Sequence, residues 1–396
     1  MDQLLEKSAQ LVENVALSRR RYLYTVINWK NRLIGIKGSR GTGKTTMLLQ
    51  RLNQLQLPPD QASYWSLDDF YFNSNTLVET AEQFYKQGGT HLFLDEVHKY
   101  ENWSVQIKNL YDFYPKLNIV FTGSSIIDIA RESGDLSRRM LMYQLHGLSF
   151  REYLEFNNIL EYPALKLSHI LLPNRNWAAL FPENFRPLKH FRDYLQYGYY
   201  PFSLEDKQGY ATRLQQLTRL IVEYDMAEIK GFDIRNAKKI LQLLSILAAN
   251  VPFQPNITAI ATKSGIHRNT VVQYLHYLEQ AQLIRLLYPS GISVALLQKP
   301  EKIYLDNPNL AFIFSEQSPN TGNLRETFFL SQVAVGHQIA YPKKGDFLID
   351  DKYTFEVGGK DKTSKQIKNI LNAYVVADNV EFPVTKLPLW LFGFLY

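Results

Sequence analysis

The sequence predicts an α/β fold in which the first ~150 residues form a mostly parallel sheet. Short, continuous apolar runs are typical of parallel strands covered on both faces. Segments with helical periodicity separate these runs, and this alternation favours parallel pairing. A first helix is expected from about Asp2 to Tyr22, with Arg19, Arg20 and Arg21 near its end as a solvated face or one that complements the helix dipole. The expected strands lie at 33–36, 63–67, 91–94 and 118–121, and the first, third and fourth of them are such runs.

The composition is that of a folded protein from a reducing compartment. The chain has 396 residues, enough for about two to four domains. Hydrophobic residues make up 45% and charged residues 21%. Cysteine is absent, so we expect no disulfide and no thiolate metal site. No apolar run resembles a signal core or a membrane span, which predicts a cytoplasmic protein without membrane contact.

The first apolar run is followed by a phosphate-binding loop. Residues 38–45 match the pattern G-x-x-x-x-G-K-[ST], and a helical segment follows them. In this pattern the backbone N–H groups cradle phosphates, the lysine supplies charge, and the hydroxyl ligates Mg²⁺. The chain is therefore expected to bind a nucleoside triphosphate. The residues predicted to hold it are Gly38, Ser39, Arg40, Gly41, Thr42, Gly43, Lys44, Thr45 and Thr46.

Polar residues also follow the third and fourth expected strands, at 91–94 and 118–121. Asp95 and Glu96 come directly after 91–94, and ligands of α/β proteins bind at the carboxyl ends of parallel strands. We expect Thr45 and Asp95 to hold Mg²⁺, and Glu96 to orient and deprotonate the attacking water. A hydroxyl after the fourth run, with Ser124 as the candidate, would bond the γ-phosphate or the water.

Arg138 and Arg139 are candidates to complete this site. An arginine often stabilises the charge that develops in phosphoryl transfer, either from the same chain or from a neighbouring subunit. A plain surface pair is the alternative interpretation. The chain is thus predicted to hydrolyse a nucleotide, with a homo-oligomer or another protein as a candidate partner.

Five short motifs together carry a family resemblance. They lie at 38–45, 93–98, 122–125, 148–154 and 197–201. The chain resembles, over nearly its whole length, the bacterial and archaeal AAA-type ATPases with a C-terminal domain of uncharacterised function. This resemblance implies ATP as the nucleotide, an AAA-like core, a winged-helix domain and a nuclease-like C-terminal domain. It implies no well-defined common activity.

The segment 236–300 is predicted to form a helix-turn-helix with a wing. Ile257, Ile260 and Ala261 share one apolar face, and Gly265 suits the turn before the next helix. Six basic residues against the single acid Glu279 give this segment a net charge of +5. That charge favours a DNA contact, and a contact within the protein or with another subunit is the alternative. The candidate DNA contacts are Lys263, His267, Arg268, Asn269 and Gln273.

Carboxylates in the last hundred residues resemble the plan of restriction-type nucleases. In that plan acids on two neighbouring strands hold Mg²⁺, and a lysine two residues after the second acid helps to activate water. The second position after Glu356 is Gly358, and Lys360 lies another two residues on, ~6–7 Å away along a strand. We therefore expect a degenerate site, with a polar sheet edge as the alternative. Its members are Glu326, Asp346, Glu356 and Lys360.

These observations predict four domains and one favoured function. The function is a Mg²⁺- and ATP-dependent, ATP-hydrolysing switch that couples nucleotide state to the winged-helix and C-terminal domains, with DNA as a candidate partner. The alternatives are an ATP-gated DNA-binding regulator with negligible turnover and a nucleotide-gated nuclease. The predicted domains are an AAA-type P-loop core at 1–150, a helical lid or linker at 151–235, the winged helix at 236–300 and a small nuclease-like α+β domain at 301–396.

Overall fold

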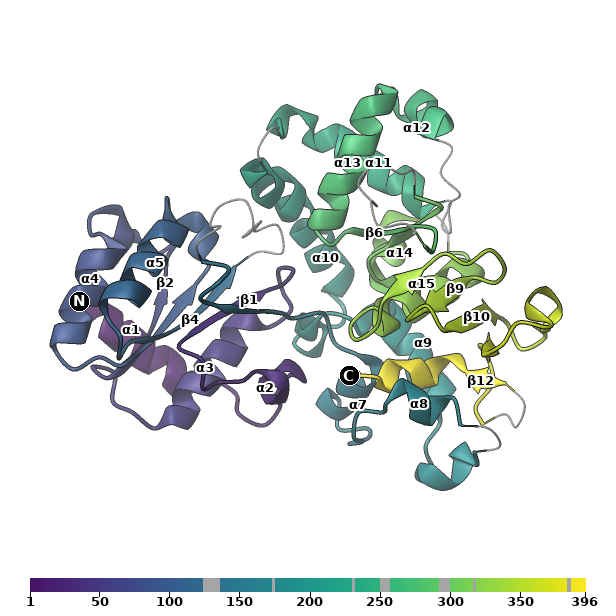
Figure 1. Cartoon of the computed structure of the whole chain (residues 1–396), viewed down its shortest axis with the longest axis horizontal. Coiled ribbons are helices and arrows are strands. Elements are labelled where there is room, and N and C mark those ends of the chain that lie inside the picture. The colour runs from purple at the N-terminus through teal and green to yellow at the C-terminus, as the bar shows by residue number, and fades with distance from the viewer. Residues whose placement is uncertain are drawn as a thin grey trace. The chain divides into compact units, whose positions relative to one another are not determined.

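The chain is divided into two compact units, Met1–His146 and Gly147–Tyr396 (Figure 1). The computed structural model describes residues 1–123, 136–172, 175–229, 232–249, 257–291, 300–315, 318–382 and 386–396. The border between the units lies four residues before the predicted end of the first domain at 150. The predicted division of the second unit into three domains stays a prediction.

A five-stranded parallel sheet forms the centre of the first unit. Its strand order is β2-β3-β4-β1-β5, and every neighbouring pair is parallel. This confirms the predicted α/β class. The fifth strand was not predicted, because it lies at the sheet edge and none of its residues is buried. The strands are β1 (Leu33–Lys37), β2 (Ala62–Ser66), β3 (His91–Asp95), β4 (Asn118–Gly123) and β5 (Leu141–Gln144).

Helices cover both faces of this sheet, and a buried apolar cluster lies on each face (Figure 1). Successive strand residues alternate between the two clusters, as pleating requires. In β3, for example, Leu92 and Leu94 belong to one cluster and Phe93 to the other. The helices are α1 (Asp2–Asn14), α2 (Leu23–Val26), α3 (Lys44–Leu55), α4 (Leu77–Lys86) and α5 (Trp103–Phe113).

The first helix is shorter than predicted. It ends at Asn14, and the chain runs without regular structure until α2 begins at Leu23. The expectation that Arg21 is solvated is wrong, because only 5% of its surface is exposed. Its guanidinium donates to the backbone carbonyls of Thr42 and His146. Because these partners are distant in the sequence, the local helical pattern of the segment could not predict its conformation.

The second unit begins with a mainly helical segment that packs against the end of the chain. Its helices are α7 (Phe150–Phe156), α8 (Leu167–Ile170), α9 (Pro187–Tyr197) and α10 (Tyr210–Leu220). Ser149 Oγ and Arg151 Nε donate to the Tyr396 carbonyl over 2.7 and 2.9 Å. The ring of Phe150 contacts those of Tyr194 and Phe394. The predicted lid or linker therefore shares its core with the C-terminal segment.

Three helices and a two-stranded antiparallel sheet follow. They are α11 (Ala237–Ala248), α12 (Ile257–Ser264), α13 (Arg268–Gln280), β6 (Ile284–Leu287) and β7 (Lys302–Leu305). α12 and α13 lie on either side of Gly265, as the sequence predicts, and Gly265 has a positive φ of 64° in the turn between them. Identification of this segment as a winged helix stays a prediction.

A second five-stranded sheet, in the order β12-β11-β10-β9-β8, ends the chain. β10 pairs antiparallel with β9 and parallel with β11. The Phe329 ring of α15 contacts the rings of Phe347, Phe355 and Phe392, so that helix and sheet share one core. The elements are α14 (Pro308–Phe314), α15 (Thr321–Val333), β8 (Ile339–Ala340), β9 (Phe347–Ile349), β10 (Tyr353–Gly358), β11 (Ala373–Ala377) and β12 (Leu387–Pro388).

Candidate functional site

The phosphate-binding loop connects β1 to α3 in a shape that requires glycine. Gly41 and Gly43 have positive φ angles of 76° and 92°, which side-chain-bearing residues rarely adopt. At Gly38 an added Cβ would lie 2.4 Å from the Leu145 carbonyl oxygen. The Thr42 hydroxyl donates to the Ser39 carbonyl over 2.8 Å and closes the curve of the loop. The loop is thus preorganised by its own sequence.

Lys44 begins α3 and turns its side chain into the loop. Its Nζ donates to the carbonyls of Gly38 and Ser39 over 2.9 and 3.1 Å, and only 5% of the residue is exposed. A cation held here by two neutral carbonyls exchanges them readily for a charged oxygen, because charge-assisted hydrogen bonds are the stronger ones. The geometry fits the predicted phosphate-binding role of Lys44.

Thr45 and Asp95, predicted to share a metal ion, lie side by side. The Thr45 hydroxyl donates to Asp95 Oδ2 over 2.6 Å. Asp95 is 2% exposed and ends β3, two strands away from β1 in the sheet. A hydroxyl and a carboxylate are the hard oxygen donors that Mg²⁺ prefers, and it usually binds through few protein ligands. The residues present therefore fit a Mg²⁺ ion.

Two further hydroxyl groups orient the Asp95 carboxylate. Tyr64 Oη donates to Asp95 Oδ2 over 2.8 Å, and the Thr122 hydroxyl donates to Oδ1. Burial, and then the charge of Asp95, raise the pKa of Tyr64 above its ordinary value, so Tyr64 stays protonated and donates. The sequence pattern contained a signal for Thr122, which opens the motif at 122–125. Tyr64 was not predicted, and the structure places it in β2, which pairs with β3.

Glu96 follows Asp95 with an unusual backbone conformation. Its φ of 52° is left-handed, which costs ~1–3 kcal/mol in a non-glycine residue and tends to occur at functional sites. Its Oε2 lies 3.3 Å from His98 Nε2 and 3.8 Å from an Arg40 Nη2. Burial, and then the charges of Lys99, Arg40 and Lys44, lower the pKa of His98 to about 3. A neutral imidazole therefore faces the predicted catalytic carboxylate, and sequence reasoning missed this residue.

The remaining candidates of the first unit are not brought to the loop by the contacts that the structure describes. Arg139 donates from Nε and Nη2 to the Asp112 carboxylate of α5 over 2.8 and 3.1 Å. Arg138 is exposed. Ser124 lies outside the described residues. Their roles in completing the site stay predictions.

The five candidate DNA contacts share one exposed region of α12 and α13. Lys263, His267, Arg268, Asn269 and Gln273 are all exposed. His267 Nδ1 accepts from the Asn269 backbone N–H over 3.4 Å at the start of α13. Arg285, counted in the predicted basic surface, is instead paired with Asp306 at 2.9 Å and 19% exposed, and Lys299 lies outside the described residues. The basic surface is thus smaller than predicted.

The carboxylates of the predicted nuclease site are paired with lysines that the sequence plan did not include. Lys302 of β7 lies 3.0 Å from Glu326 and 3.3 Å from Asp346. Lys362 lies 2.6 Å from Glu356, which is fully buried. The predicted Lys360 is exposed, and its backbone carbonyl accepts from Lys386. Lys362 is therefore the lysine paired with Glu356, and a role of Lys360 in this cluster stays a prediction.

Gly358 explains why Lys362 reaches this cluster. The strand β10 ends at Gly358 and the chain turns back, with the Lys362 N–H donating to the Gly359 carbonyl over 3.0 Å. A Cβ at position 358 would lie 2.6–2.8 Å from the carbon stem of Lys362. The glycine that interrupts the E-x-K pattern therefore makes room for a lysine from four residues further along.

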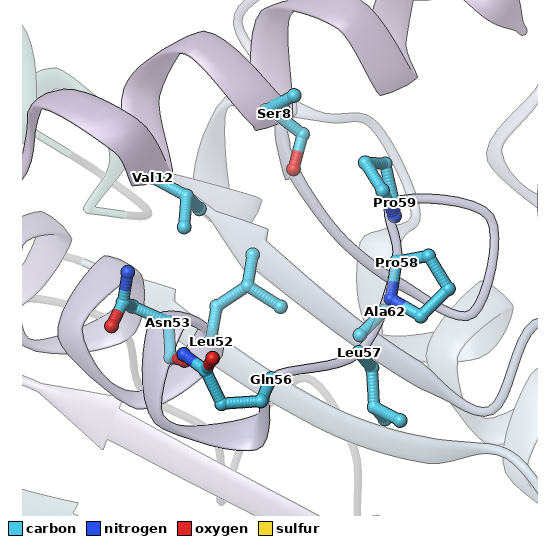
Figure 2. Close-up of a pocket in the computed structure, with 10 residues that line it drawn as sticks. Ser8, Val12, Leu52, Asn53, Gln56, Leu57, Pro58, Pro59 and Ala62 are labelled. Atoms are coloured by element: carbon cyan, nitrogen blue, oxygen red, sulfur yellow. The ribbon is translucent and has the colours of Figure 1, made fainter.

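A separate pocket of about 420 Å³ lies at the other end of the first sheet. Figure 2 shows Ser8 and Val12 of α1, Leu52 of α3 and Gln56, which directly follows α3, among the residues that line it. α3 starts at the phosphate loop and has 12 residues, a length of ~18 Å. The pocket is therefore remote from the loop and carries no part of the nucleotide site.

Comparison with known protein families finds two matches along the chain. Residues 30–154 match a family described as an AAA domain, and residues 188–319 match a domain of unknown function. An uncharacterized protein of Methanocaldococcus jannaschii is 28% identical over 372 residues, covering 86% of this chain and 78% of that protein.

Solved structures give weaker likenesses. DnaA from Aquifex aeolicus bound to AMPPCP is 16% identical, with a TM-score of 0.28 over 68% of this chain and 86% of that one. The Saccharomyces cerevisiae Hsp104–ADP complex is 15% identical, with a TM-score of 0.33 over 70% and 40%. TM-scores this low are not evidence that these proteins share a function with this chain. Within the described ranges, no helix combines the length and apolarity that crossing a bilayer needs.

Proposed function

Because residues 30–154 match a family described as an AAA domain, we propose that the chain is a Mg²⁺-dependent ATPase whose nucleotide state is coupled to its second unit. One observation carries the proposal: the Thr45 hydroxyl donates to Asp95 over 2.6 Å, with Lys44 and Glu96 directly beside them in the chain. A phosphate-binding loop and an acidic strand end are thus joined in one site.

The chemistry follows from the roles of these groups. Lys44 binds the β- and γ-phosphates with a charge that the loop already directs inward. Thr45 and Asp95 would hold Mg²⁺, which would neutralise the charge that develops on the phosphates. Glu96 accepts the proton of the attacking water, and its position is set by His98 and Arg40. Since Arg40 lies in the phosphate loop, a bound phosphate competes with Glu96 for its guanidinium.

Two substitutions separate ATP binding from the dependence of that binding on Mg²⁺. Lys44→Ala is expected to abolish ATP binding, because it removes the charge inside the loop. Asp95→Asn is expected to retain ATP binding but lose its Mg²⁺ dependence and its turnover. Isothermal titration with ATP, with and without Mg²⁺, checks both. Unchanged binding in Lys44→Ala and unchanged turnover in Asp95→Asn would contradict the proposal.

A second candidate function is a DNA-binding regulator in which ATP sets conformation with negligible turnover. The observation that favours it is the exposed group of Lys263, His267, Arg268 and Asn269 at the junction of α12 and α13. In helix-turn-helix proteins the start of the second helix contacts the DNA bases. The smaller basic surface found here keeps this function in second place.

Salt dependence of DNA affinity tests this candidate. The affinity should fall steeply with salt, differ between the ATP and ADP forms, and weaken in a Lys263→Ala/Arg268→Ala variant, whose salt slope should be lower by ~2. Lys352→Ala, which removes an exposed lysine outside α12 and α13, is the matched control. A missing or salt-independent interaction rejects the candidate.

The nucleotide-gated nuclease is the third alternative. It requires Mg²⁺-dependent cleavage of DNA that is lost in Asp346→Ala. The pairing of all three carboxylates with lysines does not favour it.

A further inference from the structure

The last residues of the first unit are fixed to its phosphate-binding loop. The Leu145 N–H donates to the carbonyl of Lys37, which ends β1, over 2.8 Å. The Arg21 guanidinium donates both to the carbonyl of His146 and to that of Thr42 in the loop. A change in the conformation of the loop on nucleotide binding therefore acts on the chain where it leaves the first unit.

The second unit begins with a buried peptide that is bound to the sequence motif at 197–201. The Leu148 N–H donates to the Tyr199 carbonyl over 2.7 Å, and the Tyr194 hydroxyl donates to the Leu148 carbonyl over the same distance. An added Cβ at Gly147 would lie 2.3–2.5 Å from carbon atoms of the Tyr199 ring. The peptide Gly147–Leu148 and Tyr199 are therefore packed so closely that neither moves without the other.

The other end of the Tyr199 side chain is bound to the hairpin β6–β7. Its hydroxyl donates over 3.1 Å to Oδ2 of Asp306, the residue that directly follows β7. Asp306 Oδ1 lies 2.9 Å from Arg285 Nη2 of β6, and the Asp306 N–H donates to the Leu283 carbonyl over 3.0 Å. Burial, and then the charge of Asp306, raise the pKa of Tyr199 well above its ordinary value, so the hydroxyl stays protonated and donates. One side chain thus contacts both the first peptide of the unit and the carboxylate that holds the hairpin.

Two buried asparagines complete the hydrogen-bond network around Tyr199. Asn309 Oδ1 accepts from the Tyr199 N–H over 2.8 Å, and its Nδ2 donates to the Tyr194 carbonyl over 3.0 Å. Asn307 Nδ2 donates to the Tyr200 hydroxyl over 3.3 Å, while Asn307 Oδ1 is buried and has no hydrogen-bond partner among the described residues. A buried acceptor without a donor is costly, so this network has a hydrogen bond to gain from a second arrangement.

We propose that Tyr199 is a conformational relay, which makes the hairpin β6–β7 follow the position of the peptide Gly147–Leu148. A shift of this peptide displaces the Tyr199 ring, and the hydroxyl then moves or releases Asp306 and, through it, Arg285 of β6. Closely packed cores have discrete arrangements and do not deform continuously, so a small shift of the peptide changes the state of the hairpin. This inference rests on the proposed coupling of nucleotide state to the second unit, and it names the residue that carries the coupling.

The relay is tested first without nucleotide, by hydrogen exchange of the full chain with mass spectrometry. Gly147→Ala displaces the Tyr199 ring and should speed the exchange of the Asp306 N–H by about tenfold or more, because the hairpin loses its bond to Tyr199. Tyr199→Phe, which keeps the ring and removes the hydroxyl, should speed this exchange to a similar degree, and adding Gly147→Ala to it should cause no further change at Asp306. Unchanged exchange at Asp306 in Gly147→Ala would overturn the inference, whether or not the chain binds ATP.

The second measurement follows the hydrogen exchange of the hairpin with and without ATP, and ATP binding is titrated on the same samples. ATP should change this exchange in the unaltered protein, whereas Tyr199→Phe should bind ATP as tightly and lose the response. Tyr304→Phe is the matched control, because it removes from β7 itself another buried hydroxyl, which donates to Glu326 over 2.7 Å. This control should keep the response to ATP.

The outcomes separate the relay from the proposed function. A response to ATP in Tyr199→Phe equal to that of the unaltered protein overturns the relay, and this result decides the matter if Gly147→Ala does not fold. An equal loss of the response in Tyr199→Phe and Tyr304→Phe also overturns it, since the hairpin would then need only its stability. A chain that binds no ATP, or whose hairpin does not respond to bound ATP, contradicts the proposed function, and the exchange at Asp306 in Gly147→Ala then decides the relay by itself.

Discussion

Three hydroxyl groups from three different elements donate to the Asp95 carboxylate. Thr45 starts α3, Tyr64 lies in β2 and Thr122 lies in β4. A carboxylate bonded on both oxygens has one orientation, and an oriented ligand binds a metal more tightly than a free one. The sheet order makes this possible, because β4 and β2 are the two neighbours of β3.

Tyr64→Phe tests the orienting role of the tyrosine hydroxyl. A hydrogen bond to a charged group contributes ~1.5–3 kcal/mol, so we expect the apparent Mg²⁺ affinity of the ATP complex to fall by at least about tenfold. The fold should be kept, because the ring stays in place. Tyr24→Phe, which removes a buried hydroxyl bonded to Gln54, is the matched control. Mg²⁺ titration of ATP binding gives the answer, and equal affinity in both variants would refute the role.

The lowered pKa of His98 predicts that the stability of the folded chain depends on pH. Its ordinary pKa of 6.5 falls to about 3 in the folded chain. Between these values the unfolded chain binds a proton that the folded chain does not. The free energy of unfolding should therefore fall as the pH decreases from 6.5, by up to ~1.4 kcal/mol per pH unit.

Denaturant unfolding at pH 7 and pH 5 checks this dependence. His98→Gln removes the titrating group and should lose less stability between the two pH values than the unaltered protein. His169→Gln, at an exposed histidine, should behave as the unaltered protein does. If the loss is the same in all three proteins, His98 is not held neutral by the fold.

At the scale of elements, the segment between α1 and α2 supports the phosphate loop through Arg21. We expect Arg21→Ala to lower the free energy of unfolding by ~1–3 kcal/mol, because buried carbonyls lose their donor, and to weaken ATP binding, because Thr42 belongs to the loop. Arg20→Ala, at the exposed neighbour, should change neither. Urea unfolding and ATP titration measure the two effects. A stability loss without weaker ATP binding would show that Arg21 serves the core alone.

The strands of the first unit could be predicted where burial makes them apolar. β1, β3 and β4 were found from their apolar runs and β2 was expected near 63–67, while the exposed edge strand β5 has no such run. The end of α1 was missed, because the position of Arg21 depends on carbonyls at Thr42 and His146, which are far away in the sequence. Local patterns therefore predict the buried elements and not those shaped by distant partners.

The candidate sites divide in the same way. Two of the predicted groups lie after β1, Lys44 and Thr45, and two lie at the end of β3, Asp95 and Glu96. In the structure the Thr45 hydroxyl donates to the Asp95 carboxylate, and Lys44 donates within the phosphate loop. Lys362 and Lys302 could not be predicted as partners of the second cluster. The first depends on a turn after Gly358, and the second comes from a hairpin at the start of the C-terminal segment. The spacing of residues along one strand shows neither the turn nor the position of Lys302.

At the scale of the whole molecule, the first unit carries the proposed nucleotide site and the chain continues into a second unit. Its residues 188–319 match a domain of unknown function. The second unit contains the two features that a nucleotide-driven switch would move, the exposed face of α12 and α13 and the hairpin that carries Lys302. Hydrolysis in the first unit is the premise on which such a switch depends.

The most direct test of this premise measures bound ATP and ATP turnover on the same preparation of Glu96→Gln. The amide keeps the size of the side chain but cannot accept the proton of the attacking water. A catalytic role of Glu96 predicts ATP binding close to that of the unaltered protein and a loss of turnover of ~100-fold or more. Turnover equal to that of the unaltered protein, with ATP still bound, would contradict it.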